Sequence, residues 1–206
     1  MTAAVESAAP FTSPGELKNL LLDLLPGQGC WTDEDYLWLT DHTNRLVEFT
    51  DGHIEGLPMP TDRHQSILEY LFWAFTSYLK PLGGKVHLAG IRLRIREGKY
   101  REPDLILLRS SKDPRREDRY WTGADLTLEV VSEDKPERDL VDKRLDYAEG
   151  GVPEYWIVNP LVETITVLRL EGNAYVEHGV FPRGTTATSA LLADFGVNVD
   201  GALDAD

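Results

Sequence analysis

Cysteine is nearly absent from this sequence, since Cys30 is its single example among 206 residues. One cysteine cannot form an internal disulfide, which excludes the disulfide scaffolds of small secreted domains. The sequence also has no zinc-ligand spacing, no glycine-rich phosphate loop and no catalytic serine or cysteine motif. Any chemistry must therefore be carried by other residue types.

Long hydrophobic runs are missing too. Apolar runs such as residues 105–108 are far too short to cross a bilayer, and the N-terminal residues show no basic start followed by an apolar stretch. We therefore expect no membrane partner, no secretion signal and a cytoplasmic location. A length of 206 residues, with 42% hydrophobic and 27% charged residues, suits one sizeable globular domain.

Positive charge is scarce, and the net charge is −14. Such a field repels a polyanion, which argues against a nucleic-acid partner. The distribution of charge favours a nucleic-acid partner, because residues 85–119 carry 11 Lys and Arg against 6 Asp and Glu. The chain therefore contains a basic segment, residues 85–119, within an acidic whole.

Periodicity and turn signals predict the order of the elements. Residues 1–15 are predicted to be disordered. The predicted helices cover residues 17–25, 33–39 with Thr32 as its cap, 62–80 and 137–149. The predicted strands cover residues 85–96, 105–108, 126–131 and 154–159, with hairpins turning at 51–52 and 172–173.

The strand–helix–strand unit over residues 126–159 implies a parallel pair of strands joined by a crossover. We therefore predict an α/β (α+β) fold, with a mixed β-sheet core flanked by helices and β-hairpins added at its N- and C-terminal sides. The single domain is expected over residues 16–200, followed by an acidic tail at 201–206.

Two carboxylates interrupt apolar strands. Asp104 opens a strand that is otherwise Leu-Ile-Leu-Leu, and Glu129 lies inside the run LTLEVV. A carboxylate in the centre of a sheet is costly unless it is paired or binds a metal, and two on neighbouring strands could chelate Mg²⁺. Each also has a simpler interpretation: Asp104 as a turn residue after Pro103, and Glu129 as a solvent-facing charge on an edge strand.

Lys143 is the third candidate. The apolar stripe of its predicted helix is formed by Leu140, Val141, Leu145, Tyr147 and Ala148. At about 100° per residue, Lys143 lies at the edge of this stripe, from where its ammonium could reach both carboxylates and stabilise charge on a phosphate. The alternative is a surface ion pair with Asp139, four residues earlier.

The stretch EPDLILL, followed by LTLEVVSEDKPERDLVDKRLDYAEGGVPEYWIVNP, closely resembles the Uma-type restriction endonuclease family of bacteria, within the PD-(D/E)XK nuclease superfamily. The resemblance extends upstream to LVEFTDGHIE and to the His64-Gln65 pair, and downstream to the hairpin after Pro160. It spans roughly residues 30–200. The combination EVVS…D…K…YA…GVPEYWIV is specific, whereas the Pro-Asp dipeptide alone is not. The resemblance implies a restriction-endonuclease-like fold.

The resemblance also implies roles for individual residues. Asp104 and Glu129 match the metal-binding Asp and Glu of the family. The wider superfamily places its lysine two residues after that Glu, where this chain has Val131. In the family that the chain resembles, the lysine lies on the following helix, where Lys143 stands.

Two further positions match the family less directly. Glu48 matches a Glu thought to join the site, so the implied metal ligands are Asp104, Glu129 and Glu48. His64 matches a family histidine near the site, so it joins the catalytic candidates. The simpler interpretations are that Glu48 lies on the polar face of its hairpin and that His64 contacts backbone at a helix start.

The arginines of the run IRLRIR alternate with apolar residues on a half-buried strand. One interpretation is that Arg92, Arg94 and Arg96 protect an exposed sheet face with charge. The other is that they contact nucleic-acid phosphates beside the metal site, with Arg101 extending that surface.

The leading expectation is a Mg²⁺-dependent endonuclease, with Mn²⁺ able to substitute, that hydrolyses phosphodiester bonds of DNA with a metal-activated water as the nucleophile. The alternative is a catalytically silent nuclease-fold protein that binds nucleic acid or acts in regulation, which the net charge of −14 favours. A dimerisation role is a third hypothesis. It rests on Trp31, Trp38 and Trp121, which look exposed, and makes a homodimer a candidate assembly.

Overall fold

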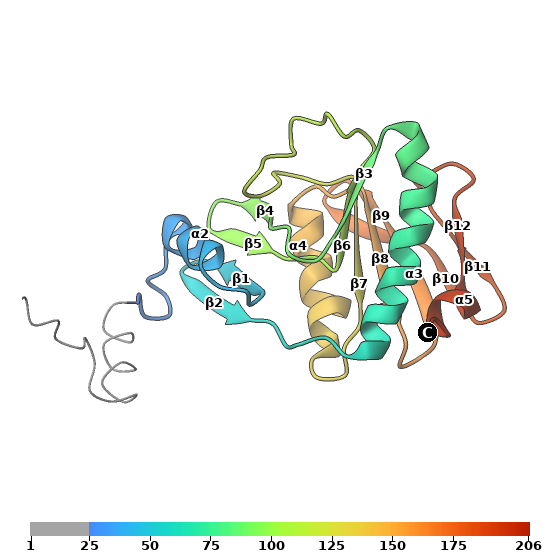
Figure 1. Cartoon of the computed structure of the whole chain (residues 1–206), viewed down its shortest axis with the longest axis horizontal. Coiled ribbons are helices and arrows are strands. Elements are labelled where there is room, and N and C mark those ends of the chain that lie inside the picture. The colour runs from blue at the N-terminus through green and yellow to red at the C-terminus, as the bar shows by residue number, and fades with distance from the viewer. Residues whose placement is uncertain (1–24) are drawn as a thin grey trace, which may run out of the picture.

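A six-stranded sheet forms the centre of the computed structural model, which describes residues 25–206 (Figure 1). In spatial order its strands are β10 (Ala174–Pro182), β9 (Thr164–Glu171), β8 (Glu154–Asn159), β7 (Leu126–Val130), β6 (Leu105–Leu108) and β3 (Lys85–Leu88). Strands β7 and β8 are parallel, and the other neighbours are antiparallel. The predicted mixed sheet and its parallel crossover pair are therefore confirmed.

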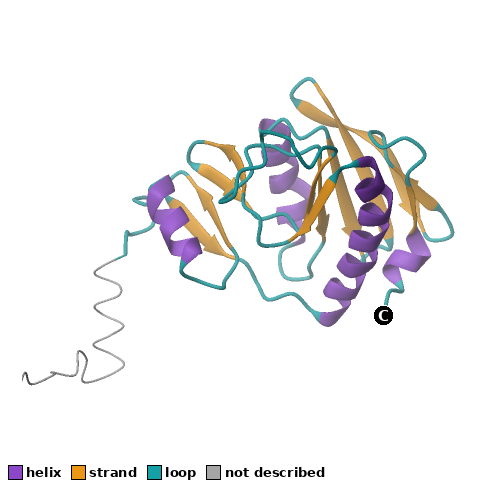
Figure 2. Cartoon of the chain, turned by 45° about the horizontal axis from the view of Figure 1, so that its top comes forward, coloured by secondary structure: helices purple, strands orange, loops and turns teal. Residues whose placement is uncertain are grey.

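Helices cover both faces of this sheet (Figures 1 and 2). Alternate residues of a strand point to opposite faces, so Leu105 and Leu107 pack into the cluster that contains α3 (Asp62–Leu79). Ile106 and Leu108 pack into the cluster that contains α4 (Lys143–Glu149). A 3₁₀ turn, η1 (Lys80–Leu82), follows α3, and a π-helical turn, η2 (Arg138–Asp142), precedes α4.

A second, four-stranded sheet lies beside the first and carries α2 (Asp33–Asp41). Its strands are, in order, β2 (His53–Gly56), β1 (Val47–Thr50), β5 (Lys99–Arg101) and β4 (Leu93–Arg96). Thr32 and Asp35 cap α2 reciprocally. The turn of the β1–β2 hairpin has positive φ at Asp51 and Gly52, as a type I′ turn requires. The predicted cap and hairpin are both confirmed.

The predicted strand over residues 85–96 is divided between the two sheets. β3 joins the six-stranded sheet, whereas β4 joins the four-stranded one. Gly90, at φ 97°, lies in the connection, in a backbone region that side chains rarely adopt. The alternation of apolar and polar residues in the sequence indicates an extended backbone. It cannot show which of the two sheets each half of residues 85–96 joins.

The C-terminal part adds a small sheet of β11 (Thr186–Thr188) and β12 (Gly196–Asn198), followed by α5 (Val199–Leu203). Ala202 and Leu203 are buried, so the acidic tail expected at 201–206 differs from the structure, in which the domain continues through α5. The disorder predicted for 1–15 and the helix predicted for 17–25 lie outside the described residues, apart from Leu25. Over residues 25–206, no helix has the length and hydropathy that a bilayer crossing requires.

Glu154, on β8, is a fully buried carboxylate that fastens the C-terminal segment to the sheet. It accepts hydrogen bonds from Trp156 Nε1 at 2.6 Å and from Ser189 Oγ and the backbone N–H groups of Ala190 and Leu191, each at 2.7 Å. These bonds offset the cost of burying the charge.

We expect Glu154→Ala to lower the free energy of unfolding by about 2–4 kcal/mol, because several buried donors lose their acceptor. Urea denaturation measures this change. The matched control is Glu177→Ala, on an exposed position of β10, which should change stability by less than about 0.5 kcal/mol. Equal stability of the two variants would show that the hydrogen bonds of Glu154 contribute nothing to the free energy of unfolding.

Candidate active site

The register of two antiparallel strands brings Asp104 and Glu129 together. Leu105 on β6 pairs with Leu128 on β7. Asp104 precedes Leu105 by one residue and Glu129 follows Leu128 by one, so the two carboxylates occupy opposing positions at the end of the pair. Side chains at opposing positions of an antiparallel pair are direct neighbours. The proximity predicted from the sequence therefore follows from the sheet itself.

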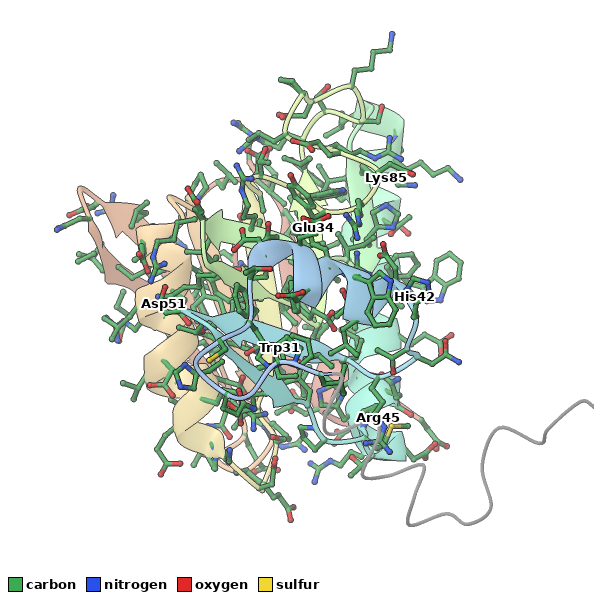
Figure 3. All side chains as sticks on the ribbon, turned by 90° about the vertical axis from the view of Figure 1, so that its left-hand side faces the viewer. Trp31, Glu34, His42, Arg45, Asp51 and Lys85 are labelled. Atoms are coloured by element: carbon green, nitrogen blue, oxygen red, sulfur yellow. The ribbon has the colours of Figure 1, made fainter. Side chains whose placement is uncertain are left out.

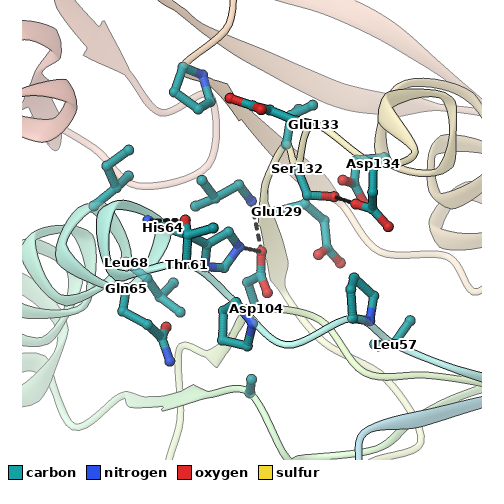
Figure 4. Close-up of a pocket in the computed structure, with 18 of the residues that line it drawn as sticks. Leu57, Thr61, His64, Gln65, Leu68, Asp104, Glu129, Ser132, Glu133 and Asp134 are labelled. Atoms are coloured by element: carbon teal, nitrogen blue, oxygen red, sulfur yellow. Dashed lines mark hydrogen bonds and ion pairs between the residues drawn. The ribbon is translucent and has the colours of Figure 1, made fainter.

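Asp104 is held by contacts to one of its two carboxylate oxygens. Oδ2 accepts a hydrogen bond of 2.8 Å from the backbone N–H of Val130 and lies 3.1 Å from Nε2 of His64 (Figure 4). Burial raises the pKa of Asp104, but the hydrogen bond and charge of His64 and the charge of Lys143 outweigh it and lower the pKa. Asp104 is thus an ionised carboxylate whose Oδ1 has no hydrogen-bond partner among the described residues.

Glu129 is engaged at both oxygens. Its Oε2 lies 2.8 Å from Nζ of Lys143, and its Oε1 accepts a hydrogen bond from the hydroxyl of Tyr147. The side chains of Lys143 and Glu129 are only 5% and 2% exposed. A lysine on α4 therefore reaches the carboxylate of β7 across the face of the sheet, as the sequence predicts.

Two more carboxylates surround the Lys143 ammonium. Nζ lies 3.5 Å from Asp139 Oδ1 and 3.6 Å from Glu48 Oε1. Burial lowers the pKa of Lys143, but the charges of Glu129, Glu48 and Asp139 outweigh it and raise the pKa above its usual value. Lys143 is therefore an ammonium at neutral pH. The ion pair with Asp139 is buried and is not the surface pair that the spacing alone allows.

The buried face of the helical segment around Lys143 is not the face that its apolar stripe predicts. Leu140, Val141 and Leu145 are 37%, 50% and 66% exposed, whereas Asp139 and Lys143 are both 4% exposed. The stripe assigned from the sequence is therefore wrong at these three leucine and valine positions. The physical reason is that Asp139, Lys143 and Tyr147 share one helical face, and their bonds to one another and to Glu129 turn that face inward.

A pocket of about 380 Å³ opens beside these groups (Figure 4). Its lining includes Asp104, Glu129 and Lys143, the first turn of α3 with His64, and the turn after β8 with Leu161. Glu48 lines a second pocket, of about 390 Å³. Glu48 is therefore connected to the first pocket by its ion pair with Lys143, which lines that pocket.

The donors that face the first pocket fit a hard divalent cation. Within residues 25–206, no three His, Cys, Asp or Glu side chains are grouped closely enough to hold a metal ion by themselves. Mg²⁺ needs fewer, because it is typically bound by one or two carboxylates and completes its shell with water and phosphate oxygens. The free Oδ1 of Asp104 and the adjacent Glu129, whose oxygens also contact Lys143 and Tyr147, would supply such a pair.

A family model described as "Uma2: Putative restriction endonuclease" matches residues 33–200. The chain belongs to this family. The crystal structure of a "putative nuclease" from Anabaena variabilis is similar to this Uma2 chain, with a TM-score of 0.69 and 21% sequence identity over 84% of this chain and 98% of that chain. At this identity the likeness shows a shared fold and confirms the predicted fold class. No curated protein matches the chain. Family and fold together support a nuclease.

The basic segment of this Uma2 chain is largely paired with carboxylates. Arg92 Nη1 lies 2.9 Å from Asp41 Oδ1 on α2, and the guanidinium of Arg94 lies over the ring of Tyr120, 5.4 Å from its centroid. Neither arginine is among the residues that line the first pocket. Their assignment as nucleic-acid contacts stays a prediction.

The other two arginines predicted to contact nucleic acid connect the β1–β2 hairpin and α4. Arg96 bridges Asp51, in the hairpin turn, and Glu149, on α4, at 2.8 and 2.7 Å. Figure 3 shows Asp51 on the side of the hairpin that faces α4. Arg101 is buried and lies 2.7 Å from Asp146 Oδ2. These pairs hold the four-stranded sheet against α4, a role that the sequence pattern could not reveal.

Several features of the site were missed at the level of sequence. Tyr147 was assigned to the apolar stripe, yet its hydroxyl donates a hydrogen bond to Glu129, and its spacing of four residues from Lys143 was the available signal. The pair of Asp139 with Lys143 was expected as a surface pair, and its burial was missed. The aromatic residues offered for a dimer surface were partly misjudged, because Trp31 and Trp121 are 6% and 2% exposed. Trp38 is exposed as expected.

Proposed function

We propose that this Uma2 protein is a Mg²⁺-dependent endonuclease that hydrolyses phosphodiester bonds of DNA, with Mn²⁺ able to replace Mg²⁺. The observation that carries the proposal is that Asp104, just before β6, lies opposite Glu129 on β7, with the Lys143 ammonium 2.8 Å from Glu129. The family description, restriction endonuclease, favours DNA as the substrate.

Asp104 and Glu129 would hold the divalent cation. The cation would supply positive charge that offsets the charge developing on the phosphate during hydrolysis. His64 keeps Asp104 in place through the 3.1 Å contact to Oδ2, which leaves Oδ1 free to hold the cation. Glu48 contributes indirectly, by helping to hold the Lys143 ammonium.

Lys143 is the fixed positive charge of the site. Its ammonium lies among Glu129, Asp139 and Glu48 and lines the pocket, so it needs no rearrangement to stabilise a negative phosphate oxygen or to orient a water. Preorganised charge in a buried site acts more strongly than the same charge in water.

The charge of the pocket explains why substrate and cation would bind together. Its lining has the carboxylates of Asp104, Glu129, Glu133, Asp134 and Asp139. Against these five carboxyl groups it has the cations of Arg63, Arg138 and Lys143. With all five carboxyl groups ionised, the pocket has a formal charge of −2, or −1 when His64 is protonated, which repels a phosphodiester until a divalent cation cancels the excess.

The test combines cation binding with cleavage of DNA. We expect calorimetry to detect Mg²⁺ binding to the wild-type chain, and we expect cleavage of at least one form of DNA, single-stranded or duplex, in Mg²⁺ or Mn²⁺ but not after chelation. An RNA substrate of matched sequence serves as the comparison for substrate class. A chain that binds Mg²⁺ and cleaves neither nucleic acid would contradict hydrolysis and favour the silent, nucleic-acid-binding alternative.

A further inference from the structure

The reactive groups lie below the protein surface. The side chains of Asp104 and His64 are 19% and 14% exposed, and those of Lys143 and Glu129 only 5% and 2%. A phosphodiester must therefore enter the pocket to reach them. In a continuous duplex, base pairing and stacking hold the phosphates on the convex outer surface of the DNA. Such a phosphate cannot readily enter a pocket to reach side chains that lie below the protein surface.

Apolar side chains also line this pocket. Leu57 and Met59 come from the loop before α3, and Leu161 comes from the turn after β8. Met59 is 88% exposed and Leu161 is 44% exposed. In Figure 4, Leu57 and His64 lie on opposite sides of Asp104. A ligand that fills this pocket meets apolar side chains and charged groups at once.

Cationic groups stand beside the same space. Arg63, in the first turn of α3, is exposed and lines the pocket, and no salt bridge to it is found within residues 25–206. Arg138 lines the pocket as well, and its ion-pair partners in the described part of the chain are Glu55 at 3.6 Å and Asp134 at 3.9 Å. The exposed guanidinium of Arg63 is thus available to phosphates next to the one at Asp104, and Arg138, whose side chain is 12% exposed, adds positive charge to the pocket lining.

We propose that the pocket takes an unpaired nucleotide, whose base lies against Leu57, Met59 and Leu161 while its phosphate lies at Asp104 and Glu129. This inference rests on the proposed function and specifies its substrate as single-stranded DNA or duplex DNA with an unpaired nucleotide. A volume of about 380 Å³ falls in the range of small-molecule pockets. The flat face of a base is an apolar surface that a paired and stacked nucleotide cannot offer.

The segment Pro58-Met59-Pro60 supports the same assignment. Two prolines restrict the backbone on either side of Met59, and all three residues are exposed at the pocket mouth. Methionine and proline are among the side chains that proteins insert between bases to unstack them. Met59 is thus placed to separate the bound nucleotide from its neighbour in the strand.

Binding is measured with Ca²⁺ in place of Mg²⁺, to slow cleavage, on a short DNA strand that carries 2-aminopurine. We expect the strand to bind more tightly than the same sequence in a perfect duplex, and its emission to rise as the base leaves its stack. The double variant Met59→Ser with Leu161→Ser should bind the strand about tenfold more weakly, within the range for lost base contacts.

The matched control is the double variant Leu82→Ser with Val162→Ser. Both residues are exposed aliphatic side chains, 65% and 63% exposed, that are absent from the pocket lining within the described chain. The control should bind the strand as the wild type does. Tighter binding of the perfect duplex, or equal affinity of the two double variants for the strand, overturns the proposal.

Cleavage in Mg²⁺ separates this inference from the proposed function. Cleavage of the strand and the duplex at equal rates, lost in Asp104→Asn, overturns the inference and leaves the nuclease function intact. Binding of the strand with increased emission, but without cleavage, supports the nucleotide pocket and contradicts the hydrolysis.

Discussion

Asp104→Asn is expected to reduce DNA cleavage in Mg²⁺ by about 10²–10³-fold while the protein stays folded. Asparagine keeps the shape of the side chain, and its carbonyl oxygen can still accept the hydrogen bond from the backbone N–H of Val130. What is lost is the negative charge of the carboxylate that would hold the cation. The variant should therefore also bind Mg²⁺ more weakly, which calorimetry measures independently of cleavage.

A matched control for this variant is Asp118→Asn, at an exposed position in the loop between β6 and β7. It makes the same chemical change away from the site, so both its cleavage rate and its Mg²⁺ affinity should equal those of the wild type. Wild-type cleavage by Asp104→Asn, together with unchanged Mg²⁺ binding, would show that the carboxylate pair does not hold the cation.

The pair Asp104 and Glu129 could be predicted from the sequence because its signal is local. Strand periodicity and the apolar residues around each carboxylate mark both positions as buried, and a buried carboxylate requires a partner. The register Leu105↔Leu128 then places them opposite each other. The fold class was predictable for the same reason, since the runs that become β6, β7 and β8 and the helix between them each have clear patterns.

The surroundings of Lys143 could not be predicted in the same way. Leu140, Val141 and Leu145 are apolar, so periodicity assigns their face to the core, yet they are exposed. The inward face contains Lys143, whose burial is offset by the carboxylates of Glu129 and Glu48, and Asp139, whose burial is offset by the Lys143 ammonium. Such a face depends on partners far away in the sequence, which a helical pattern does not contain.

The basic segment 85–119 illustrates the same limit. Its excess of positive charge is a property of the sequence, but its pairing is a property of the fold. Asp41 on α2 forms ion pairs with Arg92 and Arg119. Glu149 on α4 forms ion pairs with Arg96 and Lys99. Much of the segment's charge is thus neutralised by acidic residues from outside it, and less remains to attract DNA than its composition indicates.

Lys143→Met is expected to lower the free energy of unfolding by about 3–5 kcal/mol and to abolish detectable cleavage. Methionine keeps most of the volume of the lysine stem, so the loss is mainly one of charge. Glu129, Glu48 and Asp139 would remain buried together without their cation. Protonation of one carboxylate would relieve only part of this cost. Denaturation in the presence of a chelator measures the stability.

The control is Lys135→Met, because the Lys135 side chain is 60% exposed and pairs with a single surface carboxylate, Glu55, at 2.6 Å. Exposed ion pairs contribute about 0–1 kcal/mol, so this variant should stay close to the wild type in both stability and cleavage. A Lys143→Met variant as stable as Lys135→Met would contradict the arrangement of charges around the ammonium.

Added Mg²⁺ distinguishes the two roles of Lys143. A divalent cation that binds the folded state stabilises it by mass action, and carboxylates freed from their ammonium should attract it more strongly than in the wild type. Mg²⁺ should therefore raise the melting temperature of Lys143→Met more than that of the wild type. Cleavage should not return. The cation would replace Lys143 as a counter-ion to the carboxylates, but it could not also supply the second positive charge that the Lys143 ammonium provides at the phosphate. Recovery of cleavage together with stability would instead assign Lys143 a purely structural role.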